Sequence, residues 1–243
     1  MCKAGINILV LFTASFMLIL GCAPSHSVES DLVNASIETH GGYEAYLNLK
    51  DFNYLKTTLT PRPEGTSQDT LLQAISLPRF DETYLRYQKD NLNYEIHQYG
   101  ATTELLKEGI TIKDSLLIAE HRRIIDGANF VFFQPFKLKD RKAQFRYQGV
   151  IDLPFAEQTI RVHHLKVAFE GSSDTWHFFL DTEDHRVVAN AVDHNGKMSL
   201  ITNDAMQWHQ GLLVHKARTS YLSNLDFELI RPQASYEYEM VSE

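Results

Sequence analysis

Hydrophobic residues recur at every second position in two long blocks of the chain. The first block spans residues 51–109 and the second spans residues 143–241. A period of two is typical of strands that bury one face, and the connections inside each block are too short for the crossovers of a parallel sheet. We therefore expect an antiparallel sheet in both blocks, with some ten or eleven strands against two or three helices.

A short helix is expected before the first block, over residues 31–40. Val33 and Ile37 lie one turn apart, and a serine or aspartate precedes them as a capping residue. The glycine pair Gly41-Gly42 is placed to end this helix. The same His-Gly-Gly sequence could form an oxyanion hole or part of a metal site, but a helix terminus followed by a second turn is the simpler interpretation.

A second helix is expected between the blocks, over residues 114–126, where Leu117, His121 and Ile124 share one side. It leads into an aromatic stretch, residues 128–140. Four phenylalanines fall within seven positions of this stretch, namely Phe130, Phe132, Phe133 and Phe136. We interpret the molecule as a sheet in two halves with a helical, aromatic plug between them.

One strand of the second block changes its apolar phase without a turn. Val162 and Leu165 belong to opposite phases, and His163-His164 lie between them. One extra residue in a strand restores the inward face, so the sequence predicts a β-bulge at His163-His164.

The beginning of the chain has the pattern of a bacterial lipoprotein signal. Lys3 precedes an apolar run over residues 6–20, which is too short for a membrane span, and the run closes on Gly21-Cys22. This ending resembles a lipobox, in which the cysteine thiol receives a diacylglycerol and becomes the mature N-terminus. An uncleaved signal anchor and a plain secretory signal are the alternatives.

The lipobox divides the chain into three parts. Residues 1–21 are expected to be the signal peptide, residues 22–30 a polar tether, and residues 31–243 a single domain. Cys2 leaves with the signal and Cys22 is acylated, so we expect no disulfide in the mature chain. The formal charge is −8 and becomes −9 without Lys3, with no basic stripe, which argues against nucleic acid as a partner.

Candidate catalytic motifs are missing from the sequence. It contains no nucleophile elbow, no zinc-protease helix motif, no paired-cysteine motif and no glycine-rich phosphate loop. The second block is rich in histidine, with His163, His164, His177, His185, His194, His209 and His215. Their spacing does not recur as ligand sets do, so we predict no metal, no cofactor and no catalytic residue.

Three motifs resemble those of an uncharacterised family of bacterial lipoproteins. They are His40-Gly41-Gly42-Tyr43, the FFQPFKL sequence at 132–138, and the sequence from Trp176 to Val187. The layout is also similar to the LolA and LolB lipoprotein carriers over most of residues 31–243. This resemblance implies a mainly β (α+β) fold, a curved, unclosed antiparallel β half-barrel with helices packed in its mouth. No functional residue of the carriers aligns with a position here.

These observations predict a membrane-anchored, non-enzymatic protein that binds a lipid, a lipoprotein acyl chain or another apolar ligand. The residue after Cys22 is Ala23 rather than the aspartate that favours inner-membrane retention, so the resemblance implies the outer membrane, facing the periplasm. Six side chains are expected to line a water-poor pocket: Phe130, Phe132, Phe133, Phe136, Trp176 and Trp208. If they form a filled core instead, the protein is a structural or interaction module of the envelope. A hydrolase is the third possibility, and the oligomeric state stays open.

Overall fold

The computed structural model describes residues 27–62, 68–140, 143–155 and 158–241. The expected signal peptide, Cys22 and the first part of the expected tether lie outside these ranges. Within them, no helix combines the length and the apolar character that a crossing of the bilayer would require.

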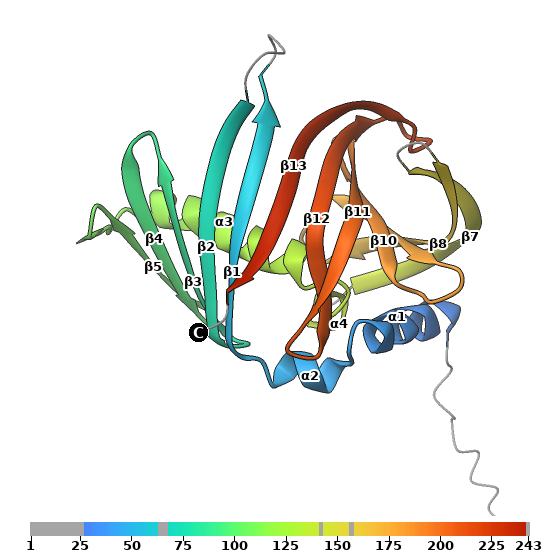
Figure 1. Ribbon diagram of the computed structural model, residues 1–243, viewed down its shortest axis with the longest axis horizontal. Helices are drawn as coiled ribbons and strands as arrows, with labels where there is room; N and C mark the ends of the chain where they lie inside the picture. Colours follow the sequence, from blue (N-terminus) through green and yellow to red (C-terminus); the bar gives the residue numbers. More distant parts are fainter. Residues whose placement is uncertain (1–26, 63–67, 141–142, 156–157, 242–243) are drawn as a thin grey trace, which may run out of the picture.

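Thirteen strands of the described chain form one antiparallel sheet in the order β6-β5-β4-β3-β2-β1-β13-β12-β11-β10-β9-β8-β7 (Figure 1). The strands are β1 (Lys50–Pro61), β2 (Gln68–Arg79), β3 (Glu82–Lys89), β4 (Leu92–Tyr99), β5 (Thr102–Lys107), β6 (Ile110–Thr111), β7 (Ala143–Phe155), β8 (Gln158–Phe169), β9 (Thr175–Asp181), β10 (Val187–His194), β11 (Lys197–His209), β12 (Leu212–Ser223) and β13 (Leu229–Val241). In this order β6 and β7 are the two edges, so the sheet is not closed.

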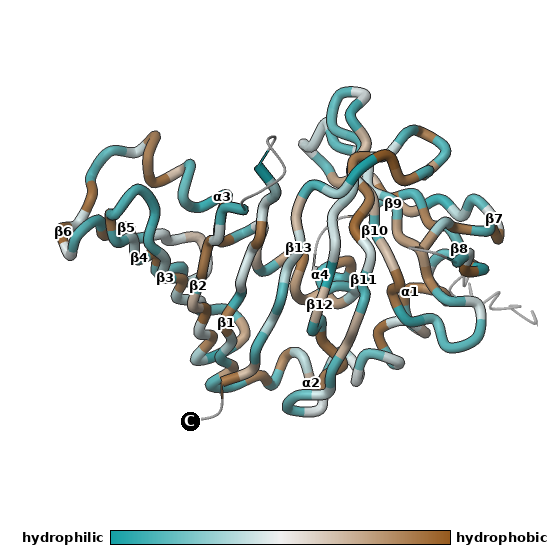
Figure 2. The backbone as a smooth tube through the Cα atoms, turned by 45° about the horizontal axis from the view of Figure 1, so that its top comes forward, coloured by the Kyte–Doolittle hydropathy of each residue, from teal (hydrophilic) through white to brown (hydrophobic). Residues whose placement is uncertain are grey.

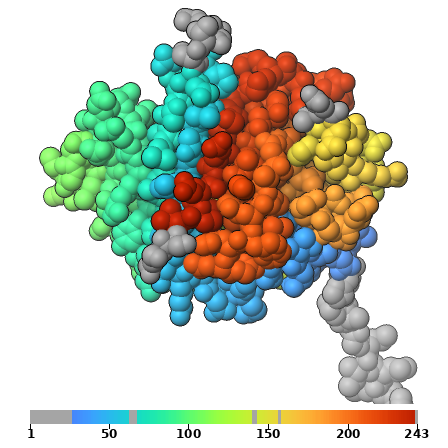
Figure 3. Space-filling view, in the orientation of Figure 1, coloured from blue at the N-terminus to red at the C-terminus, as the bar shows by residue number. Residues whose placement is uncertain are grey.

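The sheet consists of two meanders that meet at its centre. β1 to β6 follow one another across one half, and β7 to β13 follow one another across the other. β1 and β13 pair along seven residues, from Asn53 opposite Val241 to Leu59 opposite Ser235. Figure 3 shows β13 across the middle of the molecule, between the first meander and the rest of the second. The antiparallel arrangement expected from the two blocks is confirmed.

The helices of the described residues are α1 (Val28–Thr39), α2 (Tyr43–Leu47), α3 (Ser115–Phe132) and the short α4 (Lys137–Asp140). α3 connects the two meanders and runs across the sheet behind its central strands, while α1 lies beside β7 (Figure 1). We call the face that α3 covers the inner face and the opposite one the outer face. In Figure 2 hydrophobic and hydrophilic residues follow one another along the strands, as two differently covered faces require.

Both predicted helices are present, but each is longer than the sequence indicated. α1 begins at Val28 because the Ser27 hydroxyl accepts a hydrogen bond from the amide of Ser30, so residues 28–30 belong to the first turn rather than to a tether. α3 continues to Phe132, so the first half of the aromatic stretch is helical. The phenylalanines fit the buried side of α3 and therefore prolong it.

The His-Gly-Gly sequence is a helix terminus, as predicted. His40 follows α1, and Gly41 and Gly42 have φ angles of +110° and +88° before α2 begins. A Cβ atom on Gly41 would lie 2.1 Å from the carbonyl oxygen of Gly211 in the turn between β11 and β12. The His40 carbonyl also accepts a hydrogen bond of 3.0 Å from the amide of Leu213. Only glycine allows this close approach of α1 to the sheet.

The bulge predicted at His163-His164 is wrong. β8 pairs with β9 without interruption from Val162 to Ala168. The extra residue lies in the neighbouring strand, where Gln148 of β7 is inserted between partners of Leu165 and His164.

The phase change in β8 arises because the sheet has a core on each face. Leu165 belongs to the large core under the helices, whereas Val162 belongs to a smaller core on the outer face. The outer core consists of Leu153, Val162, Phe179, Val188, Ala189, Ala191, Met198, Leu200 and Phe227. A strand that contributes to the outer core first and to the inner core afterwards changes phase with no inserted residue.

Candidate functional site

A cavity of about 590 Å³ lies between α3 and the inner face of the sheet. On the helix side it is lined by Ile124, Gly127, Ala128 and Val131. On the sheet side it is lined by residues of five strands, namely Lys56, Gln73, Ser199, Ile201, Arg218, Ser220, Gln233, Tyr236 and Tyr238. The cavity therefore sits where the two meanders meet.

Small residues on α3 leave this space open. Gly127 and Ala128 stand where the helix passes over the central strands. A Cβ atom on Gly127 would meet no atom within 4 Å, so this position has room for a larger side chain. The helix is held elsewhere along its length, by a hydrogen bond of 3.0 Å from the Asn129 amide to the Thr83 hydroxyl and by the ring of Phe132, which stacks on Tyr54 at 4.0 Å.

The sheet wall follows from alternation along the strands. Tyr236 and Tyr238 of β13 point to the inner face, and Glu237 and Glu239, which alternate with them, are exposed on the other. Lys56 of β1 is directly opposite Tyr238 in the pairing of the strands, and Arg218 of β12 is opposite Tyr236.

Arg218 is buried at the bottom of the cavity, with 3% of its surface exposed. Its Nε donates to Asn203 Oδ1 at 2.8 Å, its Nη2 donates to Asn190 Oδ1 at 2.5 Å, and its Nη1 donates to the carbonyl of Val131 at 3.2 Å. Three neutral oxygens from β10, β11 and α3 thus hold the guanidinium. Its hydrogen bonds join the helix to the second meander.

Lys56 is the second cation of the cavity. Its Nζ lies 5.1 Å from the centre of the Tyr236 ring. Burial, and then repulsion by Arg218, lower the pKa of Lys56 to about 8. The ammonium is therefore still the main form at neutral pH.

Hydroxyl and amide groups complete the polar part of the lining. The hydroxyls of Ser199 and Ser220 both donate to Gln233 Oε1, at 3.2 and 3.3 Å. In this arrangement the Gln233 amide nitrogen remains available as a donor. Ile124, Val131 and Ile201 form the apolar part, so the cavity has both polar and apolar walls.

A smaller hollow of about 370 Å³ lies on the other side of α3. It shares Gly127 and Val131 with the first cavity. Phe130 and Trp176 line it, with their rings 4.8 Å apart and steeply inclined.

The six side chains predicted to line one pocket do not share a pocket. Phe132, Phe133 and Phe136 are fully buried in the large core, where Phe136 stacks on Tyr46 at 5.0 Å. Trp208 is 63% exposed and borders a separate hollow beside Ile160 and Met206. Of the six, only Phe130 and Trp176 line the hollow next to the main cavity.

The cations of the cavity were missed by the sequence analysis. Lys56 has a signal in the sequence, because it occupies the buried phase that Phe52 and Tyr54 begin in the same strand. Arg218 has a weaker signal, because it shares the alternate phase of the buried Leu212 and Val214, but the exposed Lys216, which the pairing of β11 with β12 skips, interrupts that series.

Two histidines of the second block, His164 and His177, form a close pair on the outer face. Among the described residues no group of three or more histidine, cysteine or acidic side chains is suited to holding a metal ion. His164 Nε2 and His177 Nδ1 lie 2.8 Å apart on the outer face, against Phe179 and Phe227. Burial is the main cause that lowers the pKa of each to about 4, so the pair is neutral at pH 7.

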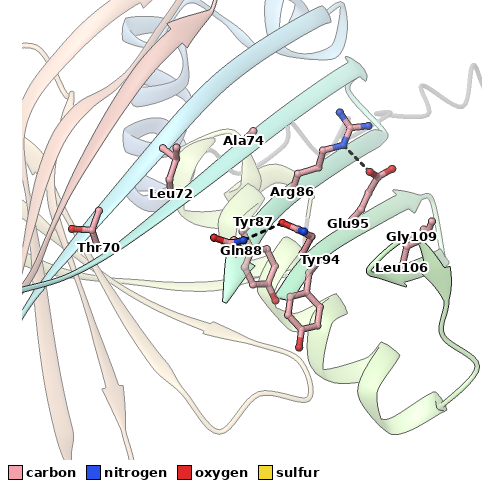
Figure 4. Close-up of a pocket in the computed structure, with 11 residues that line it drawn as sticks. Thr70, Leu72, Ala74, Arg86, Tyr87, Gln88, Tyr94, Glu95, Leu106 and Gly109 are labelled. Carbon is pink, nitrogen blue, oxygen red and sulfur yellow. Dashed lines mark hydrogen bonds and ion pairs between the residues drawn. The ribbon is translucent and has the colours of Figure 1, made fainter. Parts of the chain in front are cut away.

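Another hollow, of about 560 Å³, lies over the neighbouring strands β2 to β5 (Figure 4). Its charged residues neutralise each other, since Arg86 Nε lies 2.8 Å from Glu95 Oε2. Leu72 in its wall is 53% exposed, so the hollow is open to solvent. It offers less enclosure and less unpaired charge than the cavity under α3.

Comparison with known proteins identifies the fold. No protein-family model and no curated protein matches the sequence. Among solved structures, a LolA superfamily protein from Nitrosomonas europaea matches with a TM-score of 0.55 and 9% identity, over 90% of this chain and 95% of that one. The fold is LolA-like.

Further solved structures resemble this LolA-like chain. A DUF1329 family protein from Desulfovibrio piger matches with a TM-score of 0.54 and 7% identity, over 87% of this chain and 91% of that one. A domain described as outer membrane lipoprotein-sorting, from Vibrio parahaemolyticus, has a TM-score of 0.49 and 9% identity, over 87% and 89%. The predicted mainly β, unclosed antiparallel half-barrel with helices in its mouth is confirmed, and identities this low concern the fold alone.

Proposed function

We propose that this LolA-like protein is a lipid-anchored, non-enzymatic binding protein of the cell envelope. In this proposal it holds a lipid or another apolar ligand in the cavity between α3 and the inner face. The observation that carries the proposal is the cavity of about 590 Å³, which the chain's own side chains leave unfilled. Its volume falls in the range of small-molecule sites.

The lining supports an amphiphilic ligand. Ile124, Val131 and Ile201 offer apolar contacts, and the polar side chains gather on the strands below. The hollow with Phe130 and Trp176 adjoins this cavity across Gly127 and Val131, so we assign it to the apolar end of the ligand.

The lining also supports binding over hydrolysis. Ser199 and Ser220 line the cavity. Their hydroxyl groups donate to the Gln233 amide oxygen rather than to a base. The described residues that line the cavity include no histidine and no carboxylate. A serine without a base is not an activated nucleophile.

The sequence supports the position in the cell. The lipobox ending at Cys22 favours a lipid anchor, and Ala23 favours the outer membrane, with the domain in the periplasm. The anchor would then hold the open cavity close to the lipids of the membrane.

Filling the cavity tests the proposal. Gly127→Trp places an indole in the open space beside α3, and Gly127→Ala is the matched control that changes the helix without filling the space. We expect the parent and the alanine variant to bind a fluorescent fatty acid saturably, and the tryptophan variant to bind at least about tenfold more weakly, since it displaces the ligand.

Native mass spectrometry of protein extracted gently from its host should show the bound ligand directly. Absence of a bound mass, together with no saturable binding by the parent, would refute the proposal. The alternative would then be a structural or interaction module.

A further inference from the structure

Two cations face the cavity under α3, and no described carboxylate lies within ion-pair distance of either. Arg218 has only neutral oxygens as partners, and the contact of the Lys56 ammonium is with the Tyr236 ring. The lining contributed by α3 and the five strands is otherwise neutral. The cavity therefore has a local positive charge in a chain whose formal net charge is −8.

Acidic residues on the same elements have other partners or are exposed, and on β11 Asp204 accepts hydrogen bonds from Thr202 and Thr219. Glu237 and Glu239 of β13 alternate with the inward tyrosines and are exposed. Asp126 of α3 lines the adjoining hollow, where it accepts a hydrogen bond of 2.7 Å from Gln98 and pairs with Arg122 at 3.6 Å. Nothing in the described part of the chain neutralises Lys56 and Arg218.

Buried charge without a counter-charge is costly, and proteins ordinarily pair it. The asparagine and carbonyl oxygens that hold Arg218 supply hydrogen bonds but no negative charge. An anion in the cavity would supply it, and would form charge-assisted hydrogen bonds, which are stronger than neutral ones. The Gln233 amide nitrogen would add a neutral donor.

We propose that the ligand is an anionic amphiphile whose carboxylate or phosphate head binds between Lys56 and Arg218. Its apolar part lies along Ile124, Val131 and Ile201 and extends towards Phe130 and Trp176. This inference rests on the proposed binding function and names the chemical class of the ligand.

Probes with one hydrocarbon chain and different heads test the class. A long-chain fatty acid, the corresponding alkyl phosphate and the corresponding alcohol compete with the fluorescent fatty acid, and inorganic phosphate is titrated alone. We expect either or both of the charged probes to bind roughly 10- to 100-fold more tightly than the alcohol, the range expected for hydrogen bonds to a charged group. The ratio between the two charged probes distinguishes carboxylate from phosphate.

Lys56→Gln tests the site. We expect it to remove most of that preference by weakening the charged probes far more than the alcohol, and we expect Lys56→Arg to restore the preference. Lys216→Gln is the matched control, because it removes the same charge from an exposed position on the strand that carries Arg218. Chemical denaturation of each variant shows that it is folded at the temperature of the binding assay.

The failures of the two proposals are distinguishable. Equal affinities for charged and uncharged probes, unchanged in Lys56→Gln, would overturn the anionic head and leave the binding function intact. Binding of inorganic phosphate with no binding of any amphiphile would also overturn it, in favour of a free-anion site. If the parent binds none of the probes, both proposals fail.

Discussion

At the scale of residues, the histidine pair of the outer face has a clear thermodynamic role. His164 and His177 are each less than 10% exposed and pack against Phe179 and Phe227. Burial is the first cause of the low pKa of both, and the charge of Lys166 adds to it. The outer core is therefore built around two imidazoles that must stay neutral.

This pair should make stability depend on pH. The pKa of each histidine is about 4 in the folded protein and about 6.5 in the unfolded chain, so the unfolded chain takes up protons first. The contribution of the neutral histidines to the free energy of unfolding is fully present above pH 6.5. It is lost as the pH is lowered towards 4, on the order of 3 kcal/mol for each histidine. Urea denaturation across this interval measures the loss.

A double variant, His164→Leu with His177→Leu, should reduce that slope. The slope will not vanish, because burial also lowers the pKa of His40 to about 4. The same slope in the parent and the double variant would contradict the assignment.

At the scale of elements, the aromatic stretch joins α3 to the base of the sheet. Phe132 closes the helix against Tyr54, and Phe133 and Phe136 follow it into contact with Tyr46. These rings are at most 1% exposed, so they form a filled core rather than a removable plug.

Truncation of these rings should therefore cost the full amount for a core phenylalanine. Phe133→Ala and Phe136→Ala are expected to lower the free energy of unfolding by about 3–5 kcal/mol. Phe130→Ala should cost less, because Phe130 borders the hollow with Trp176 and the neighbouring space already exists. Guanidinium denaturation of the three variants and the parent measures the difference, and the reverse order would show that the filled core lies elsewhere.

The elements also show where periodicity is a sufficient guide. It predicts the helix before Phe130, because that helix buries one side only. It is misleading in β8, where Val162 and Leu165 contribute to cores on opposite faces. The polar lining of the cavity escapes it for a different reason, because the exposed Lys216 interrupts the run of alternate buried positions between Val214 and Arg218.

At the scale of the whole molecule, the lipid anchor can be tested independently of the cavity. Cys22→Ala should leave an unprocessed precursor that takes up no labelled fatty acid, because the thiol that accepts the diacylglycerol is gone. Cys2→Ala is the matched control, since Cys2 leaves with the signal peptide, and it should be processed like the parent. Metabolic labelling and membrane fractionation measure both, and normal acylation of Cys22→Ala would remove the basis of the proposed location.

The architecture was predictable as a sheet in two halves, but the pair of strands that joins the halves was not. Short connections between strands fix neighbours within each meander. The pairing of β1 with β13 joins segments from opposite ends of the domain, and no local pattern in Lys50–Pro61 or Leu229–Val241 specifies that partner. The residues that line the cavity could not be predicted either, because the cavity lies across this junction.

The pairing of β1 with β13 has a consequence for biosynthesis. The strand that completes the sheet, β13, comes after the other twelve along the chain, and it pairs with β1 on one side and β12 on the other. Until it arrives, both strands expose rows of unpaired backbone groups, which are templates for aggregation. A chain in which β13 has not yet paired is thus more prone to aggregate than the folded domain, and its folding depends on Leu229–Val241, which follows the other twelve strands.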